Sequence, residues 1–153
     1  MFKKLLNKKL LKNQKGLTLI ELLAVIVILA IVAAIAIPAI GSIIDNSRGK
    51  ALKSDVVNVM NAANIYFTDN PADDKKPSVD LETLKKDGYL ESEGKLTSAT
   101  VTYAAGGNTV DAAGTNGSIT ITVTKATLKD INDHDGKPEG KDVTITHTTT
   151  TTP

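Results

Sequence analysis

A run of 23 residues from Leu22 to Ile44 contains no charged side chain, and this feature constrains the chain more than any other. An α-helix rises about 1.5 Å per residue, so about 20 such residues cross the ~30 Å hydrocarbon core of a bilayer. A helix buried inside a soluble domain rarely needs so long an apolar run. We therefore expect residues 17–44 to form a hydrophobic helix that can span a membrane.

The charges on the two sides of this run differ in sign. Residues 1–16 carry six lysines and no acidic residue, whereas the rest of the chain carries 12 basic and 17 acidic residues, a net charge of −5. Positive charge accumulates on the cytoplasmic side of a membrane span. We expect a single-pass protein whose N-terminus is cytoplasmic and whose acidic body lies outside.

The leader does not end as a secretory signal peptide does. Such a signal has a shorter apolar stretch, and its small-residue cleavage site follows that stretch. Here the small residue at a charge boundary is Gly16, which precedes the apolar run. Cleavage after Gly16 would remove the basic leader, residues 1–16, and leave the hydrophobic helix on the mature chain.

Glu21 is an acidic residue at the start of the hydrophobic segment. An ionised carboxylate costs about 2.5–3.5 kcal/mol at the centre of a span and less toward its end. Glu21 either lies in water at headgroup depth or has a cationic partner. The α-amino group of Leu17, with a pKa of about 8 once freed by cleavage, is such a partner in the same chain or in a neighbour. A pair between neighbours is head-to-tail, and such contacts generate helical filaments when they do not close.

The sequence KGLTLIE at residues 15–21, followed by a long apolar run that contains Pro38, resembles the class III prepilin signature of type IV pilins and pseudopilins. The resemblance covers about residues 1–50. It implies cleavage after Gly16 by a prepilin peptidase and N-methylation of Leu17. It also implies that an assembly ATPase and an inner-membrane platform build a helical homopolymer. Many members of the family begin the mature chain with Phe, and this chain would begin with Leu.

The resemblance gives Pro38 a meaning, because in this family the N-terminal helix partly melts in the filament near such a proline. Proline removes a backbone hydrogen bond and clashes with the preceding turn, and nearby Gly41 loosens the helix further. The implied function is that of a structural subunit of a Gram-positive-like type IV pilus. The precursor would be anchored in the membrane, and the extracellular filament would serve adhesion, motility or surface attachment.

The body of the chain, residues 45–147, reads as a small α+β domain. The helix is predicted to continue over 45–67, because apolar residues recur there at spacings of three and four, and Asn70-Pro71 should stop it. Residues 68–90 are predicted to form a loop and a short helix, capped by Ser78 or Asp80 and followed by Gly88. The apolar face of the predicted helix consists of Leu52, Val56, Val59, Met60, Ala63 and Phe67.

Residues 96–147 show apolar residues alternating with threonine, which predicts half-buried strands. We expect three antiparallel strands, around Ala99–Tyr103, Ile119–Val123 and Val143–Ile145, with turn signals at 106–108 and 116–117. The helix over 45–67 should cover the apolar face of this sheet, which is the pilin fold. The threonine-rich tail, residues 148–153, is predicted to be disordered.

One loop, DINDHDGKPEGKD, is rich in carboxylates, which suit a hard cation such as calcium. Its candidate ligands are Asp130, Asp133, Asp135 and Asp142. The EF-hand pattern fails here, because placing Asp135 at the fifth position puts Ile131 at the first, where an acid is required. A solvated acidic loop is the default interpretation, and calcium is the alternative.

Catalysis and cofactors are not indicated. The chain has no cysteine, its two histidines, His134 and His147, lack a third ligand at zinc spacing, and no nucleophile–base pattern occurs. We predict no enzyme activity, no cofactor and no strong nucleic-acid binding, since the processed chain is net negative and poor in aromatic residues.

Two other functions remain open. The first is a pseudopilin of a competence machine for DNA uptake or of a type II secretion machine, which builds a short filament. The second is an uncleaved single-span surface protein that displays a small ligand-binding domain. The N-terminal residue of the mature protein and the length of the filament would separate these alternatives.

Overall fold

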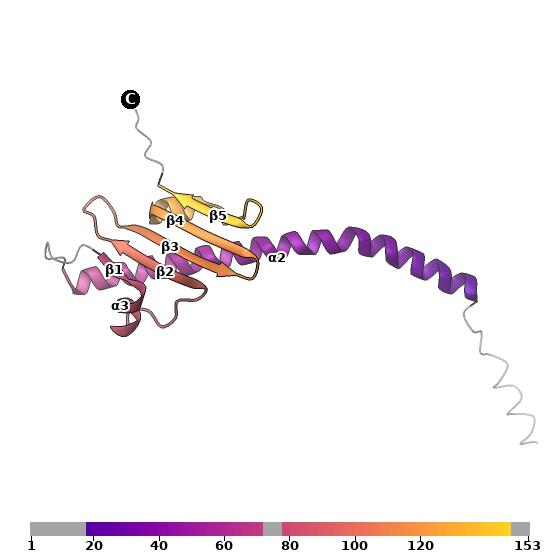
Figure 1. Cartoon of the computed structure of the whole chain (residues 1–153), viewed down its shortest axis with the longest axis horizontal. Helices are drawn as coiled ribbons and strands as arrows, with labels where there is room; N and C mark the ends of the chain where they lie inside the picture. Colours follow the sequence, from indigo (N-terminus) through magenta and orange to yellow (C-terminus); the bar gives the residue numbers. More distant parts are fainter. Residues whose placement is uncertain (1–17, 72–77, 148–153) are drawn as a thin grey trace, which may run out of the picture. The chain divides into compact units, whose positions relative to one another are not determined.

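A computed structural model describes residues 18–71 and 78–147 of the chain (Figure 1). The predicted leader (1–16), its cleavage site at Gly16 and Leu17, and the predicted disordered tail (148–153) lie outside these residues. The elements are α2 (Leu19–Asp69), β1 (Ser78–Asp80), α3 (Leu81–Lys86), β2 (Leu96–Thr102), β3 (Thr109–Asn116), β4 (Ile119–Thr127), α4 (Leu128–Asp133) and β5 (Asp142–Thr146).

The chain forms two compact units, of which the first ends at Ile40 and the second begins at Gly41. Helix α2 contributes to both. In the first unit its side chains are almost all exposed, whereas in the second unit one face of it is buried in a hydrophobic core. The second unit contains all of the strands, and we call it the head.

The head part of α2 is amphipathic, as predicted. All six apolar residues predicted for its buried face are 6% exposed or less, from Leu52 to Phe67. The helix ends at Asp69, two residues beyond the predicted end, and the amide nitrogens of Asn70 donate to the Tyr66 carbonyl at 2.8 and 3.0 Å. Pro71 follows, where a further helical turn is disfavoured.

The five strands form one sheet in the order β1-β2-β3-β4-β5 (Figure 1). Strands β1 to β4 pair antiparallel with one another in sequence order, but β5 runs parallel to β4. The prediction of three antiparallel strands was therefore wrong in two respects: it missed β1 and β3, and it gave β5 the wrong direction. The physical reason for the direction is α4, which carries the chain back between β4 and β5 as a crossover.

The two predicted turns lie at the two ends of β3 and connect it to β2 and to β4. The turn at 106–108 joins β2 to β3, with Gly107 at φ 123°, and the turn at 116–117 joins β3 to β4, with Gly117 at φ 65°. Opposite Asp111, the ladder between β3 and β4 shifts register, and Lys125 adopts φ 48° there. The Lys125 amide donates to the Asp111 carboxylate at 3.1 Å, which fixes this bulge.

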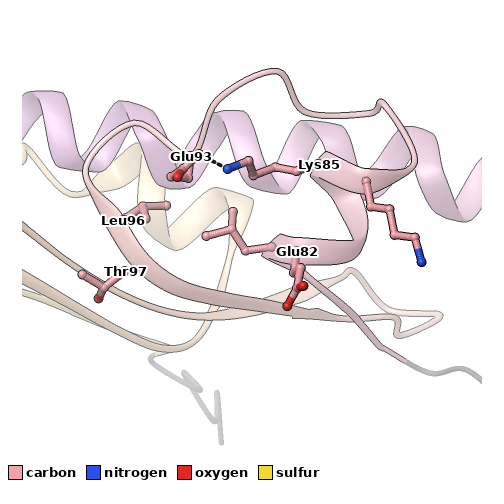
Figure 2. Close-up of a pocket in the computed structure, with 7 residues that line it drawn as sticks. Glu82, Lys85, Glu93, Leu96 and Thr97 are labelled. Atoms are coloured by element: carbon pink, nitrogen blue, oxygen red, sulfur yellow. Dashed lines mark ion pairs between the residues drawn. The ribbon is translucent and has the colours of Figure 1, made fainter.

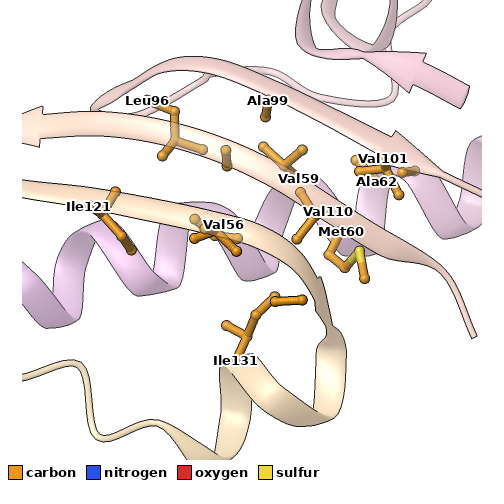
Figure 3. Packing of buried hydrophobic residues seen from close by; sticks show 14 of the residues in the cluster. Val56, Val59, Met60, Ala62, Leu96, Ala99, Val101, Val110, Ile121 and Ile131 are labelled. Carbon is orange, nitrogen blue, oxygen red and sulfur yellow. The ribbon is translucent and has the colours of Figure 1, made fainter. Parts of the chain in front are cut away.

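One hydrophobic core holds the head together (Figure 3). Val56, Val59 and Met60 of α2 pack against alternate residues of β2, β3 and β4, and Ile131 of α4 completes the same cluster. The α+β arrangement of a long N-terminal helix on a mostly antiparallel sheet is thereby confirmed. The opposite sheet face carries exposed threonines, among them Thr122, Thr124 and Thr144.

The short helix α3 has the predicted start and end. Asp80, rather than Ser78, is its N-cap, since the Asp80 side chain accepts from the Thr83 amide at 2.8 Å. Hydrogen bonding from Thr83, first through its side chain and then through its amide, holds the pKa of Asp80 below its usual value. Gly88 follows the helix at φ 81°, a conformation that glycine adopts readily.

Candidate functional site

The first turn of α2 is closed by a reciprocal pair of side chains, Thr18 and Glu21. The Glu21 Oε2 atom accepts from the Thr18 amide and from the Thr18 hydroxyl, both at 2.8 Å. The Glu21 amide donates to the Thr18 hydroxyl oxygen at 3.3 Å. This is a capping box, in which residue N3 and the N-cap satisfy each other's free amides.

Glu21 was predicted from the sequence as a site residue, whereas Thr18 was not. The signal was present, because Thr-x-x-Glu before an apolar run is the sequence pattern of a capping box. The structure places Glu21 exposed in the first turn of α2, and the residues with which it was predicted to act, Gly16 and Leu17, lie outside the described part.

The capping box leaves part of the Glu21 carboxylate available. A carboxylate has two oxygens with about four lone-pair directions, and the Thr18 donors both bind Oε2. Within residues 18–71 and 78–147, Oε1 has no hydrogen-bond donor. Glu21 can therefore hold its own helix start and still accept a hydrogen bond from an outside cation.

The first part of α2 is apolar on every side. Leu22, Leu23 and Ile28 are 52%, 55% and 60% exposed, although they point in different directions, at least about 100° apart around the helix. A helix that is hydrophobic all round belongs in lipid or among other apolar helices. Of the described helices, α2 alone is long and apolar enough to cross a membrane, and none of the most apolar stretch is buried.

Pro38 and Gly41 both lie inside α2, which is helical through both. The division between the two compact units falls between these two residues, at Ile40 and Gly41. A methyl group added at Gly41 would meet nothing within 4 Å. The helix is predicted to loosen near Pro38 in the assembled filament. The structure of a single chain does not test this, so the loosening stays a prediction.

The four aspartates of the predicted acidic loop have separate partners. Asp130 is residue N3 of α4 and forms a second capping box, accepting from the Thr127 amide at 2.8 Å and its hydroxyl at 2.6 Å. His147 Nδ1 lies 2.8 Å from the same carboxylate oxygen. The Thr127 hydroxyl, followed by His147, lowers the pKa of Asp130 to about 2.

The other three aspartates are also engaged locally. Asp133 pairs with Lys129 at 2.6 Å, Asp135 pairs with Lys137 at 3.1 Å, and the backbone of Asp142 bonds the backbone of Glu139. Within the described ranges, no three His, Asp or Glu side chains group as a metal ion would require. His134 Nδ1 accepts from the Gly136 amide at 2.9 Å, which is a turn contact.

A surface groove of about 490 Å³ lies between α3 and the start of β2 (Figure 2). The apolar side chain of Leu96 lines it, and the Lys85 ammonium crosses it to reach the Glu93 carboxylate at 2.6 Å. This ion pair ties α3 to the loop before β2. The groove has no nucleophile beside a base, and so it gives no indication of catalysis.

Comparison with known families identifies the N-terminal region. Residues 11–37 match the model of the prokaryotic N-terminal methylation motif, a stretch that includes Gly16, Leu17 and Glu21. No curated protein and no solved structure matches the chain. The proteins that carry this class III signal are structural rather than enzymatic, and the signal implies a prepilin peptidase and pilus assembly machinery in general. The chain thus carries the signature of type IV pilins and pseudopilins, followed by a pilin-like α+β fold.

Proposed function

We propose that the chain is a structural subunit of a type IV pilus, which a prepilin peptidase cuts after Gly16 and N-methylates on Leu17. The mature subunit then polymerises into an extracellular filament for adhesion, motility or surface attachment. The observation that carries this proposal is a methylation motif on a helix whose apolar side chains are exposed all round.

The exposed apolar helix needs two successive environments. The class III signal and this helix fit a precursor anchored in a membrane and later assembled into a surface filament. We place the lysine-rich leader in the cytoplasm, by the positive-inside bias. Each buried Leu or Ile side chain gains roughly 1.5–3 kcal/mol relative to water, so leaving the lipid is tolerable only if the helices repack against one another. We infer that an assembly ATPase and a membrane platform carry the subunit from one environment to the other.

Glu21 provides the contact that orients the subunits. In our proposal its Oε1 atom accepts from the α-amino group of Leu17 in a neighbouring subunit, while Oε2 remains bonded to Thr18. A charge-assisted bond of this kind is about twice as strong as a neutral one. Because the contact is head-to-tail, it propagates into a helical filament.

The capping box makes the test sharper, because charge and cap can be removed separately. Glu21→Gln keeps an oxygen that can accept from Thr18 but loses the negative charge, and glutamine also serves in a capping box. Thr18→Ala removes the cap and keeps the charge. We expect Glu21→Gln to abolish filaments in negative-stain micrographs of sheared surface material, and Thr18→Ala to retain them. Filaments of normal length from Glu21→Gln would contradict the assigned role.

Mass spectrometry of the N-terminus separates the remaining functions. A mature chain that begins at Leu17 with an added methyl group supports a pilin or pseudopilin, whereas a chain that begins at Met1 shows an uncleaved membrane protein. Filaments that extend well beyond the cell surface support the pilus. Filaments that only span the envelope would assign the chain to a competence or secretion machine instead.

A further inference from the structure

We propose that the outer edge of β5 is a contact site for a second copy of this chain, which adds its own β5 antiparallel to it. The contact lies in the head, it uses neither Glu21 nor the apolar part of α2, and it does not depend on the function proposed above.

The hydrogen-bond pattern shows which backbone groups of β5 face outward. In the parallel ladder with β4, the Lys141 carbonyl accepts from Thr120, and the His147 amide donates to Thr124. Alternate residues of a strand direct their backbone groups to opposite sides. The odd-numbered residues from 141 to 147 therefore face β4, and Asp142, Thr144 and Thr146 face outward.

Only the first of these three outward-facing residues has a partner in the described part of the chain. The backbone groups of Asp142 exchange hydrogen bonds with Glu139 at 2.9 and 3.2 Å. Thr144 and Thr146 are exposed, and their outward amides and carbonyls have no partner within residues 18–71 and 78–147. The edge thus presents the amide and the carbonyl of Thr144 and those of Thr146, to which an added strand can form hydrogen bonds.

The opposite edge of the sheet is protected, and β5 is not. Strand β1 has three residues, it leads directly into α3, and it ends in the charged Asp80. Short length and charge discourage pairing between edges. In β5 the residues from Val143 to Thr146 carry no charge and include no proline, and their β-branched side chains favour extended structure. We infer that β5 is the edge that accepts a strand.

The edge is complementary to itself in one register. If Thr144 pairs with Thr146 of the second copy, then Thr146 pairs with Thr144 of that copy, and every outward group of both residues is used. The two-fold axis passes between the two copies of Ile145. This register places no two like charges opposite each other between Val143 and Thr146, and threonine pairs of this kind stabilise neighbouring strands.

The surroundings of the edge leave room for the second strand. Helix α4 lies beside the C-terminal end of β5, where His147 contacts Asp130. A groove of about 510 Å³ runs between the two elements, lined by Thr144, Thr146 and the α4 residues Lys129 and Asp133. In an antiparallel pair the two α4 helices lie at opposite ends, so each faces the start of the other copy's β5. The contact closes on itself, and it joins two heads side by side without extending a filament.

Because the chain has no cysteine, single cysteines can report the register. We would prepare the full-length protein in detergent as Thr144→Cys, as Thr146→Cys and, for the control, as Thr122→Cys, an exposed residue of the neighbouring strand. Paired residues in an antiparallel ladder have Cα atoms about 5.5 Å apart, which a disulfide can bridge.

We expect mild oxidation of a mixture of Thr144→Cys and Thr146→Cys to give several-fold more disulfide dimer than either variant alone. The Thr122→Cys control should give only the background seen for random encounter in micelles. Equal cross-linking of the control, or no excess in the mixture, would overturn the proposal.

A backbone variant tests the same contact independently. Thr144→Pro removes an outward amide without removing a hydrogen bond to β4, so an edge strand can accept it. We expect it to reduce the mixed cross-link made through Thr146→Cys to background, while Thr144→Val leaves it unchanged. Circular dichroism would confirm the fold. If Thr144→Pro does not fold, Thr144→Lys replaces it, because a charge on the edge opposes strand pairing. An undiminished cross-link in either variant, once it is shown to be folded, would contradict the proposed contact at the β5 edge.

Discussion

The two parts of α2 use similar apolar residues in opposite ways. In the first part Ile31 is 58% exposed, and its neighbours all round the helix are also apolar. In the head part Leu52 is fully buried, and charged residues such as Lys50 occupy the other face. The difference shows that the head part is covered by its own chain, whereas the apolar side chains of the first part are left uncovered by residues 18–71 and 78–147.

Truncation of one apolar residue in each part should have the largest and most different effects. We expect Leu52→Ala to lower the free energy of unfolding of the head by about 2–5 kcal/mol, through lost burial and the cavity left behind. Ile31→Ala should leave that free energy unchanged and weaken filaments instead. Urea unfolding followed by the tyrosine signal, together with filament yield, measures both. An equal loss of head stability in the two variants would break the comparison.

The two glycines of α2 test the same contrast at the backbone. A methyl group at Gly49 would collide with the Gly136 carbonyl oxygen, which cannot move as a flexible side chain can, whereas Gly41 has open space. We expect Gly49→Ala to destabilise the head by about 1–3 kcal/mol. Gly41→Ala should stabilise the helix by up to about 1 kcal/mol, since glycine is a poor helix former. Thermal unfolding of the two variants side by side would show this difference in sign.

The head also has a capping box of its own, at the start of α4, in which the carboxylate of Asp130 is held within the chain. Asp130 is 20% exposed and holds three hydrogen-bond contacts, to the amide and hydroxyl of Thr127 and to His147. We expect Asp130→Ala to cost about 1 kcal/mol at pH 7, because the amide and hydroxyl of Thr127 lose their carboxylate acceptor. Asp133→Ala, which removes an exposed ion pair on the same helix, serves as the control and should have no measurable effect.

The pH dependence of this difference follows from the lowered pKa of Asp130, which is about 2 in the folded protein against 3.8 ordinarily. Stabilisation by a carboxylate with a lowered pKa is complete above pH 4 and is lost as the pH falls from about 4 to 2. The stability difference between wild type and Asp130→Ala should therefore shrink over that range. A difference that stays constant down to pH 2 would show that the charge of Asp130 is not involved.

The smallest effect is expected where the head has a surface ion pair. Lys85 and Glu93 are 40% and 39% exposed, so water and salt screen their attraction. Glu93→Gln should leave the unfolding midpoint within experimental error and should leave filament formation intact. A clear loss of stability would mean that the loop before β2 depends on this ion pair. The stability of the head would then rest on a surface ion pair as well as on its hydrophobic core.

The parts of the fold that the sequence predicted are those with strong periodicity. Leu52, Val56 and Val59 recur at helical spacing, and their burial follows from that spacing alone. Strand β3 was missed because its centre reads Ala112-Ala113-Gly114, residues that are uncommon in strands and hold no clear alternation. Its place is set by its neighbours, since Gly114 packs so closely on Lys95 and Leu96 that a side chain would not fit.

The direction of β5 and the caps depended on short local signals. The acidic residues around Asp130 were read as a solvated loop, although Thr127 and Asp130 have the spacing of a capping box and Ile131 is buried in the core. Once that helix is recognised, a crossover and a parallel strand become the natural arrangement. At the N-terminus Glu21 stood out as a lone charge, but its bond to Thr18 required the backbone geometry to be seen.

The parallel pairing of β5 also sets the order in which the head can be completed. Val143 and Ile145 fill part of the core, and they come from the last described strand, after every other element has been synthesised. Until these residues leave the ribosome, one edge of β4 has no neighbouring strand, and the core against which α2 packs lacks two of its side chains. The apolar first part of α2 is made early and the closing strand late, so that part of the helix leaves the ribosome before the head can complete its core.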